Sequence, residues 1–166
     1  MHRAGRHGAR LHSPEASCGR QGGRFAYALQ SRAVSKPSVA EVEARSYELD
    51  PYGHLNNAVY VNWLEHGRLC FLRDRGHTYA SVPETFGVHV VVVRQDLQYK
   101  AQVRLGDRLF VTSRIARLGR TSFTFAQEIA FGDGRVASSG EVTMVCVGKD
   151  GAAAPIPPGL RSLLDS

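Results

Sequence analysis

Apolar and polar positions along the chain follow two different periods. In residues 40–46, small or apolar side chains alternate with polar ones, which predicts a half-buried strand with one face in water. After a break at residues 50–53, apolar or small residues recur at intervals of three and four, so one face of a helix is apolar. That face consists of Tyr60, Trp63, Leu64, Gly67 and Phe71. We therefore predict a long helix that begins near Asn57 and ends near Gly76, because glycine often follows the last residue of a helix.

Four further strands are predicted in the second half of the chain. Residues 88–99 are rich in β-branched side chains, and the four valines at 90–93 predict a strand that is covered on both faces at its middle. The other three strands are residues 109–118, 123–131 and 135–147. Turn signals separate them, of which Gly132-Asp133-Gly134 is the strongest hairpin signal.

The order of these elements predicts an α+β domain. An antiparallel sheet exposes one apolar face, and a single long helix can cover it. Residues 78–86 are predicted to be a connector, and the proline-containing segment after Lys149 a loop with a short helix at 160–164. Gly67 within the long helix costs about 1 kcal/mol relative to alanine. Either close contact between helix and sheet or a tolerated weakness would account for it.

The net charge of +6 comes from the N-terminal segment. Residues 1–36 contain seven basic residues and one acidic residue, whereas residues 37–166 contain fourteen of each. The basic charge therefore gives no indication that the folded part binds nucleic acid. The segment is rich in glycine and poor in large aliphatic residues, so we predict that it is disordered. A targeting peptide, a nucleic-acid arm and an extension outside the functional domain are all compatible with it, and we favour the extension.

These patterns predict three parts: an extension at residues 1–36, one folded domain at 37–150 and a C-terminal tail at 151–166. No apolar run approaches the ~18 residues that cross a bilayer. The cysteines Cys18, Cys70 and Cys146 are widely spaced, so neither a disulfide framework nor a zinc site is predicted, and the cytoplasm is the expected setting. G-x-S-x-G, P-loop, dinucleotide-binding and H-E-x-x-H motifs are missing from the sequence, and we expect no metal and no cofactor.

The densest group of candidate catalytic residues surrounds the break before the long helix, in YELDPYGHLNNAVY (residues 47–60). Proline fixes φ and glycine permits positive φ, so the D-P-Y-G segment predicts a sharp turn, and an asparagine before a helix can cap it. A carboxylate, an imidazole and a helix N-terminus thus fall within the eight residues from Asp50 to Asn57. Such groups can support acyl chemistry, because amides of the first helical turn stabilise an oxyanion while a carboxylate activates water or attacks directly. Each feature alone is also common in ordinary turns and caps.

The pattern D-x-x-G-H-x-N-N-x-x-Y, followed by a helix with a glutamate, resembles the signature of hotdog-fold acyl thioesterases. The resemblance is closest to the 4-hydroxybenzoyl-CoA thioesterase-like branch, which includes bacterial long-chain acyl-CoA and plant acyl-ACP thioesterases. It covers about residues 39–147. It implies an antiparallel five- to six-stranded sheet wrapped around one long helix, and a cofactor-free reaction on acyl-CoA or acyl-ACP. It also implies a homodimer or homotetramer with active sites between subunits.

This resemblance assigns roles to four residues near the turn. Asp50 matches the catalytic carboxylate, either as a general base on water or as a nucleophile through a mixed anhydride; a turn-forming Asp is the alternative. Asn57 matches the position whose backbone N–H binds the thioester carbonyl. His54 and Asn56 match the H-x-N-N of the acyl-ACP branch, where the histidine is catalytic. That branch carries asparagine where this chain has Tyr52, so a structural histidine is an equal alternative.

Further candidates lie outside the turn or have weaker support. Glu65 lies fifteen residues after Asp50, as does the catalytic glutamate of a second hotdog branch, but a helical glutamate more often pairs with a neighbour such as Arg68. The substrate-binding candidates are Gly53 and Asn56 in the turn, Tyr60 and Trp63 as walls of an acyl pocket, and Arg117 and Arg120 as partners of carrier phosphates. The apolar residues are alternatively plain core, and the arginines ordinary surface residues.

The function predicted from these residues is an acyl-CoA or acyl-ACP thioesterase that releases a fatty or aromatic acid and a thiol. A hotdog enoyl-CoA hydratase is a second enzyme class, disfavoured because its D-x-N-P-x-H pattern is not in the sequence. A non-catalytic acyl-CoA sensor on the same fold is the alternative from another class, and such a sensor would need no carboxylate at Asp50.

Overall fold

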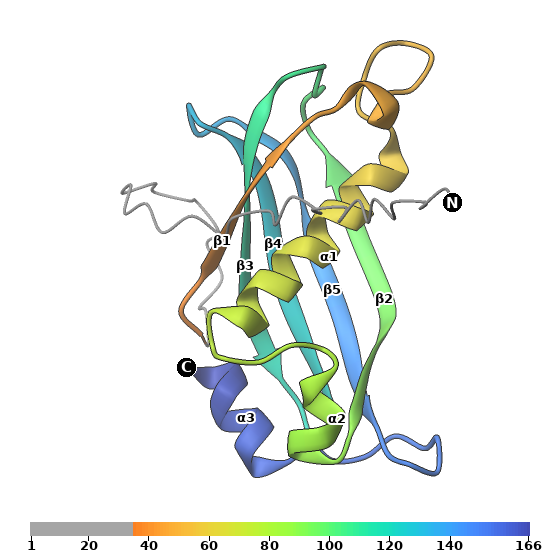
Figure 1. The fold of residues 1–166 in the computed structure, drawn as a ribbon, viewed down its shortest axis with the longest axis vertical. Helices are drawn as coiled ribbons and strands as arrows, with labels where there is room; N and C mark the ends of the chain where they lie inside the picture. Colours follow the sequence, from red (N-terminus) through yellow and green to blue (C-terminus); the bar gives the residue numbers. More distant parts are fainter. Residues whose placement is uncertain (1–34) are drawn as a thin grey trace, which may run out of the picture.

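The computed structural model describes residues 35–166, and the expectations for residues 1–34 lie outside this range. One antiparallel five-stranded sheet curves around a long helix, α1 (Figure 1). The strands are β1 (Ser38–Glu43), β2 (His89–Tyr99), β3 (Arg108–Leu118), β4 (Ser122–Phe131) and β5 (Val136–Val147). The helices are α1 (Asn57–Arg73), α2 (Ser81–Phe86) and α3 (Pro158–Asp165), with a 3-10 turn, η1, at Ser46–Glu48. The predicted α+β architecture is confirmed.

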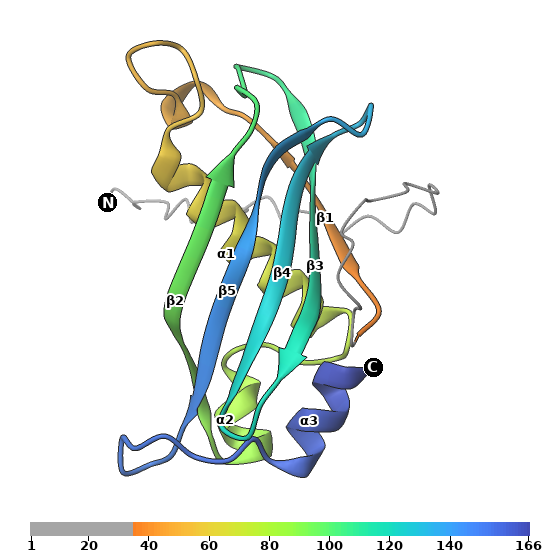
Figure 2. The ribbon, with the colours of Figure 1, turned by 180° about the vertical axis from the view of Figure 1, so that it is seen from behind.

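The strand order across the sheet is β1-β3-β4-β5-β2. Strands β3, β4 and β5 form the predicted meander, and β1 pairs with β3 at one edge. Strand β2 pairs with β5, so β1 and β2 form the two opposite edges of the sheet (Figure 2). Both strands nevertheless precede the meander in sequence. The chain that leaves β2 must therefore cross the end of the sheet before β3 begins, and this crossing lies beside the start of α1.

Local chemistry accounts for both ends of helix α1. The Asn56 side chain accepts a hydrogen bond from the backbone N–H of Ala58 at 3.0 Å, which makes Asn56 the N-cap. The helix ends at Arg73, and Gly76 follows with φ of +80°, a left-handed conformation that suits glycine. The observed end is two or three residues before the predicted one.

A close contact between α1 and the sheet accounts for Gly67. A Cβ at this position would lie 2.7 Å from both Ser113 Oγ and Val111 Cγ1 on β3. Beside it, the fully buried Gln127 of β4 donates hydrogen bonds from Nε2 to the Leu64 carbonyl oxygen at 2.8 Å and to Ser113 Oγ at 2.7 Å. Glycine is thus required at position 67 because α1 and β3 approach each other closely there. The Gln127 amide sets the distance between the helix and the sheet.

The core has two parts that lie toward opposite ends of α1. The first contains Trp63, Leu64 and Cys70 together with residues of β1 and β3, and the second lies under α2 and α3. Ile156, Leu160 and Leu164 are buried in the second part, packed among side chains that include Phe123 and Phe125. The segment at 151–166, predicted as a C-terminal tail with a short helix, contains α3 and contributes side chains to this part of the core.

Strand β2 differs most from its prediction. Its valines were expected to be covered on both faces, but Val91, Val92 and Val93 are 42%, 43% and 58% exposed in the single chain. The cause is the position of the strand: β2 is an edge strand, paired on one side only, and its register shifts between Val92 and Arg94. An apolar sequence run does not distinguish a central strand from an edge strand.

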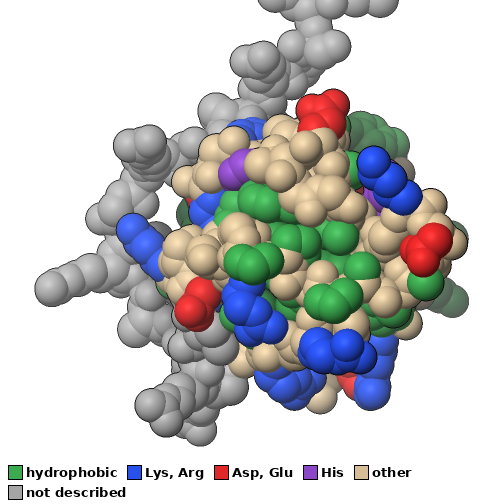
Figure 3. Space-filling view, turned by 90° about the horizontal axis from the view of Figure 1, so that it is seen from below, with side chains coloured by type: hydrophobic (Ala, Val, Ile, Leu, Met, Phe, Trp, Pro, Cys, Tyr) green, Lys and Arg blue, Asp and Glu red, His purple; other side chains and the backbone are tan. Residues whose placement is uncertain are grey.

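The connector at residues 78–86 contains the short helix α2, which ends at Gly87 with φ of +73°. Helices α2 and α3 lie at the end of the molecule away from the Asp50 turn (Figure 1). Viewed from that end, hydrophobic side chains lie at the centre and lysine and arginine side chains around part of the edge (Figure 3). Within residues 35–166, no helix combines the length and apolar character needed to cross a membrane.

Candidate active site

The Asp50 carboxylate is held by the backbone of its own turn. Asp50 Oδ1 accepts hydrogen bonds from the backbone N–H groups of Tyr52 at 2.9 Å and His54 at 3.0 Å. The turn is closed by the Asp50 N–H, which donates to the His54 carbonyl oxygen at 2.7 Å, and Gly53 has φ of +74°. The turn-forming role considered for Asp50 is therefore real, and it fixes the carboxylate while leaving Oδ2 without a partner among the described residues.

The start of α1 presents an unpaired amide. Asn57 is the first helical residue, and the Asn56 cap serves the next N–H, that of Ala58. No hydrogen bond to the Asn57 N–H is formed within residues 35–166, as expected of the first amide of a helix. The positive end of the helix dipole lies at the same place. An oxygen that gains negative charge would be stabilised here.

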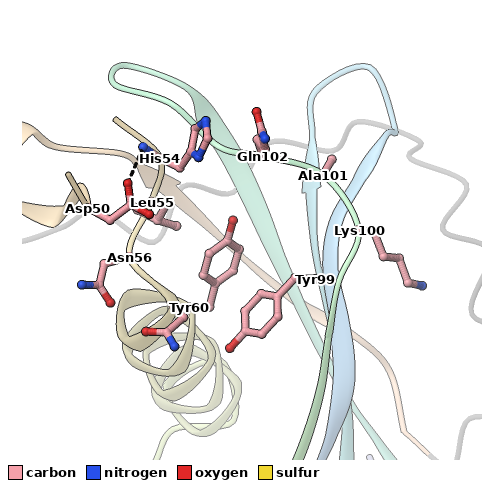
Figure 4. A pocket seen from close by; sticks show the side chains of 10 residues that line it. Asp50, His54, Leu55, Asn56, Tyr60, Tyr99, Lys100, Ala101 and Gln102 are labelled. Carbon is pink, nitrogen blue, oxygen red and sulfur yellow. Dashed lines mark hydrogen bonds between the residues drawn. The ribbon is translucent and has the colours of Figure 1, made fainter. Parts of the chain in front are cut away.

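A cavity of about 520 Å³ connects these groups. It is lined by Asp50, His54, Leu55, Asn56, Asn57 and Tyr60 from the turn and α1, and by Tyr99, Lys100, Ala101 and Gln102 from the end of β2 and the crossing that follows it. Figure 4 shows the rings of Tyr60 and Tyr99 between these two segments, with the Lys100 side chain directed away from them. The cavity thus forms where the crossing passes the start of the helix.

The two tyrosines form the wall of the cavity. Their ring centroids are 5.1 Å apart with an interplanar angle of 78°, an edge-to-face contact. Tyr60 is buried, and burial, followed by the charge of Tyr99, raises the pKa of the Tyr60 phenol above its usual value. Tyr60 therefore stays protonated and can donate a hydrogen bond at neutral pH.

The turn residues other than Asp50 divide into two groups. His54 and Asn56 line the cavity, as the resemblance implied, although the Asn56 side chain is also occupied in capping α1. In Figure 4 the His54 ring lies near the Gln102 side chain. Gly53 does not line the cavity, and its place in the turn follows from its backbone conformation. A catalytic role for His54 stays a prediction.

Glu65 is not part of this cavity. It is exposed on α1, two turns beyond Asn57. The expected pair with Arg68 does not form either, because Arg68 is buried and its Nη1 donates to Gln127 Oε1 at 2.8 Å. Within the single chain, Glu65 is therefore not brought together with Asp50.

Three other candidates also lie outside the cavity. Trp63 is a core residue, as the alternative interpretation held. Arg117 forms an exposed ion pair with Glu141, with Nη2 and Oε2 2.6 Å apart, and Arg120 lies in the turn between β3 and β4. Within the single chain, neither arginine borders the cavity. A guanidinium group suits a phosphate, but its presence in the sequence does not show where it lies in the fold.

Sequence reasoning missed Tyr99 and Gln102. Tyr99 ends β2 and Gln102 follows it, 49 and 52 residues after Asp50, so only the tertiary fold brings them to the turn. An aromatic residue at the end of a strand was the one available signal. Within residues 35–166 no group of histidine, cysteine and acidic side chains is arranged to hold a metal ion.

The sheet wrapped around α1 is a hotdog fold. The chain belongs to the thioesterase-like superfamily, whose family model matches residues 44–164. The chloroplastic acyl-acyl carrier protein thioesterase ATL3 of Arabidopsis thaliana is 33% identical over 85 residues, which are 51% of this chain and 44% of that protein. The long-chain acyl-CoA thioesterase FadM of Escherichia coli is 30% identical over 108 residues, 64% of this chain and 80% of that protein.

The crystal structure of the probable thioesterase YbaW from Escherichia coli has a TM-score of 0.69 and 29% sequence identity. The match covers 76% of this chain and 96% of that one. The chain spans less than half the length of the plant relative, whereas it spans most of the bacterial protein. The family resemblance seen in the sequence is confirmed.

Proposed function

We propose that the chain is a thioesterase that hydrolyses acyl-CoA or acyl-ACP to a free acid and a thiol. The observation that supports this most strongly is that the Asp50 carboxylate and the unpaired Asn57 amide border one cavity. A thioester carbonyl that accepts a hydrogen bond from the Asn57 N–H would have its carbon on the Asp50 side of the helix start. The family and the relatives named for acyl thioesters support the same reaction.

In the proposed reaction, Asp50 Oδ2 accepts a proton from water while the water oxygen bonds to the thioester carbon. The carbonyl π electrons move to oxygen, and the Asn57 N–H and the helix dipole stabilise the resulting anion. When this intermediate collapses, the carbon–sulfur bond breaks and sulfur leaves with the electron pair. The thiolate takes the proton from Asp50, which restores the carboxylate. In the nucleophilic alternative, Asp50 Oδ2 attacks the carbon itself and water then cleaves the mixed anhydride.

We also propose that two copies associate through β2 to form a homodimer, which can pair further into a tetramer. The support is an unpaired strand edge with three adjacent exposed valines, a combination that otherwise favours aggregation. The cavity lies beside the end of the same strand, so a partner there would border it. In such a dimer Glu65, Arg117 and Arg120 would serve the partner's site if they serve any. The two described cysteines are free thiols, in keeping with the cytoplasmic setting expected from the sequence.

The deciding experiment is release of free thiol from a panel of aliphatic and aromatic acyl-CoAs and acyl-ACPs by the wild-type chain and by Asp50→Asn. Asparagine keeps an oxygen that can accept the Tyr52 and His54 hydrogen bonds, so the turn is retained and only the charge is lost. We expect kcat to fall by about 10²–10⁴-fold, the usual contribution of a positioned acid–base group. Asp107→Asn is the matched control, because Asp107 also accepts a backbone N–H, that of Arg104, but lies outside the cavity.

If Asp50→Asn hydrolyses thioesters as fast as the wild-type chain, the proposed role of Asp50 is contradicted. Binding of acyl-CoA without any thiol release would favour the sensor alternative, and hydration of an enoyl-CoA would favour the hydratase.

A further inference from the structure

The Tyr60 hydroxyl is a polar group of the cavity wall that the reaction above does not use. Tyr60 is only 4% exposed, and its hydroxyl forms no hydrogen bond within residues 35–166. The hydroxyl oxygen itself is accessible from the cavity, since it is not one of the fully buried side-chain atoms without a partner among the described residues. Tyr60 lines the same cavity as Asp50, so a molecule bound there could accept a hydrogen bond from this hydroxyl.

Helix geometry places the Tyr60 ring beside the unpaired Asn57 amide. Tyr60 follows Asn57 by three residues, and side chains at this spacing lie on the same face of a helix. Helical side chains also lean toward the N-terminus, so Tyr60 covers the turn that contains Asn57. In Figure 4 its hydroxyl points into the space between the Asp50–His54 turn and Gln102.

The surroundings of the ring leave its hydroxyl suited to donate rather than to ionise. The edge-to-face contact with Tyr99, at 5.1 Å, holds the ring from the β2 side, which restricts its rotation. Burial raises the pKa of the phenol, so the proton is retained across the neutral range. A fixed, neutral donor that is partly desolvated stabilises developing negative charge better than a mobile, fully hydrated one.

We propose that Tyr60 Oη is the second hydrogen-bond donor to the thioester carbonyl oxygen, acting together with the Asn57 N–H. This inference rests on the proposed thioesterase function. It replaces the apolar role expected for Tyr60 from the sequence with a catalytic one. The bond strengthens as the carbonyl oxygen becomes negative, so its loss should affect kcat more than KM.

The test is Tyr60→Phe, which removes one oxygen and keeps the ring contact with Tyr99. Steady-state kinetics on the best acyl-CoA of the panel should show kcat reduced by about 10²–10³-fold, as when one oxyanion donor is removed, with KM within about threefold of wild type. Tyr79→Phe is the matched control: Tyr79 is also largely buried, but its hydroxyl lies 3.9 Å from Met144 Sδ, away from the cavity. This control should retain wild-type kinetics.

A second measurement reports the hydrogen bond without turnover. The infrared carbonyl stretch of bound ¹³C-labelled S-(2-oxopropyl)-CoA, a ketone analogue that cannot be hydrolysed, should be at lower frequency in wild type than in Tyr60→Phe. Equal frequencies, an unchanged kcat, or a change confined to KM would each overturn the inference while leaving the proposed function intact. A wild-type chain that hydrolyses none of the thioesters would overturn the proposed function and this inference with it.

Discussion

Asp50 and His54 are joined by two hydrogen bonds in opposite directions: the His54 N–H donates to Asp50 Oδ1, and the Asp50 N–H donates to the His54 carbonyl oxygen. The carboxylate is thus oriented by main-chain groups of its own turn and needs no other side chain to position it. The next two residues lead directly to the cap of α1. One local structure therefore sets both the carboxylate and the first helical amide.

The Asp50 turn should respond differently to two substitutions. Asp50→Ala removes the acceptor of both the Tyr52 and His54 N–H groups and should lower the free energy of unfolding by about 1–2 kcal/mol, since a typical hydrogen bond contributes about 0.5–1.5 kcal/mol. Asp50→Asn keeps an acceptor oxygen and should remain near wild-type stability. Urea denaturation measures both, and equal stability of the two variants would show that the hydrogen bonds contribute little. Both variants should show strongly reduced thioesterase activity, because neither carries the carboxylate.

Charge at the β2 edge should prevent self-association. Val93 is 58% exposed and lies at the register shift of β2. Val93→Lys would place an ammonium group in the proposed dimer interface, and we expect sedimentation equilibrium to show a monomer where the wild type is a dimer. Val39→Lys is the control, because Val39 is 36% exposed on β1, the opposite edge strand. A monomer produced by Val39→Lys alone would place the interface at β1.

Gly67→Ala should destabilise the protein even though alanine favours helices. The added Cβ would lie 2.7 Å from Ser113 Oγ and Val111 Cγ1, so the helix or the strand must shift. Overpacking of this kind costs about 1–3 kcal/mol, whereas the gain in helix propensity is about 1 kcal/mol. Thermal unfolding should show a lower Tm. The exposed Asn62 of the same helix provides the comparison, since Asn62→Ala should leave Tm unchanged or slightly raised.

His66 should make stability depend on pH below neutrality. Burial, and secondarily the positive charge of Arg73, lowers the pKa of His66 below its ordinary value of 6.5. As pH falls below 6.5 the unfolded chain therefore binds a proton before the folded chain does, and stability decreases until the folded-state pKa is passed. His66→Gln should reduce this loss between pH 7 and pH 5, measured by urea denaturation at several pH values. The same slope in both proteins would exclude His66 as its source.

The parts of the fold that depend on local chemistry were predictable from the sequence. The three-and-four spacing defines α1 because helical side chains repeat with that period, and Asn56 caps it because its side chain is the right length. The same local signals located the meander strands, whose turns contain glycine or aspartate. The start of α1 and the candidate residues beside it therefore follow from the sequence alone.

The sequence does not show which residues that are distant along the chain lie close together in the fold. Nothing in the valine run at 90–93 distinguishes an edge strand from a central one, because the pattern records apolarity and not pairing. Tyr99 reaches the Asp50 turn only through the order of the strands. Arg117 has suitable chemistry for phosphate but is held on the sheet by Glu141. These outcomes were set by tertiary structure.

The burial of Leu160 and Leu164 against Phe123 and Phe125 has a practical consequence for preparing the protein. The sequence alone would permit a shortened version that ends at residue 150. Without α3, however, the second part of the core would be exposed to water. Expression clones should therefore run through Asp165, and a purification handle is better joined at the other terminus. A low yield of the truncated protein would then result from the loss of core side chains. It would carry no information about the Asp50 turn.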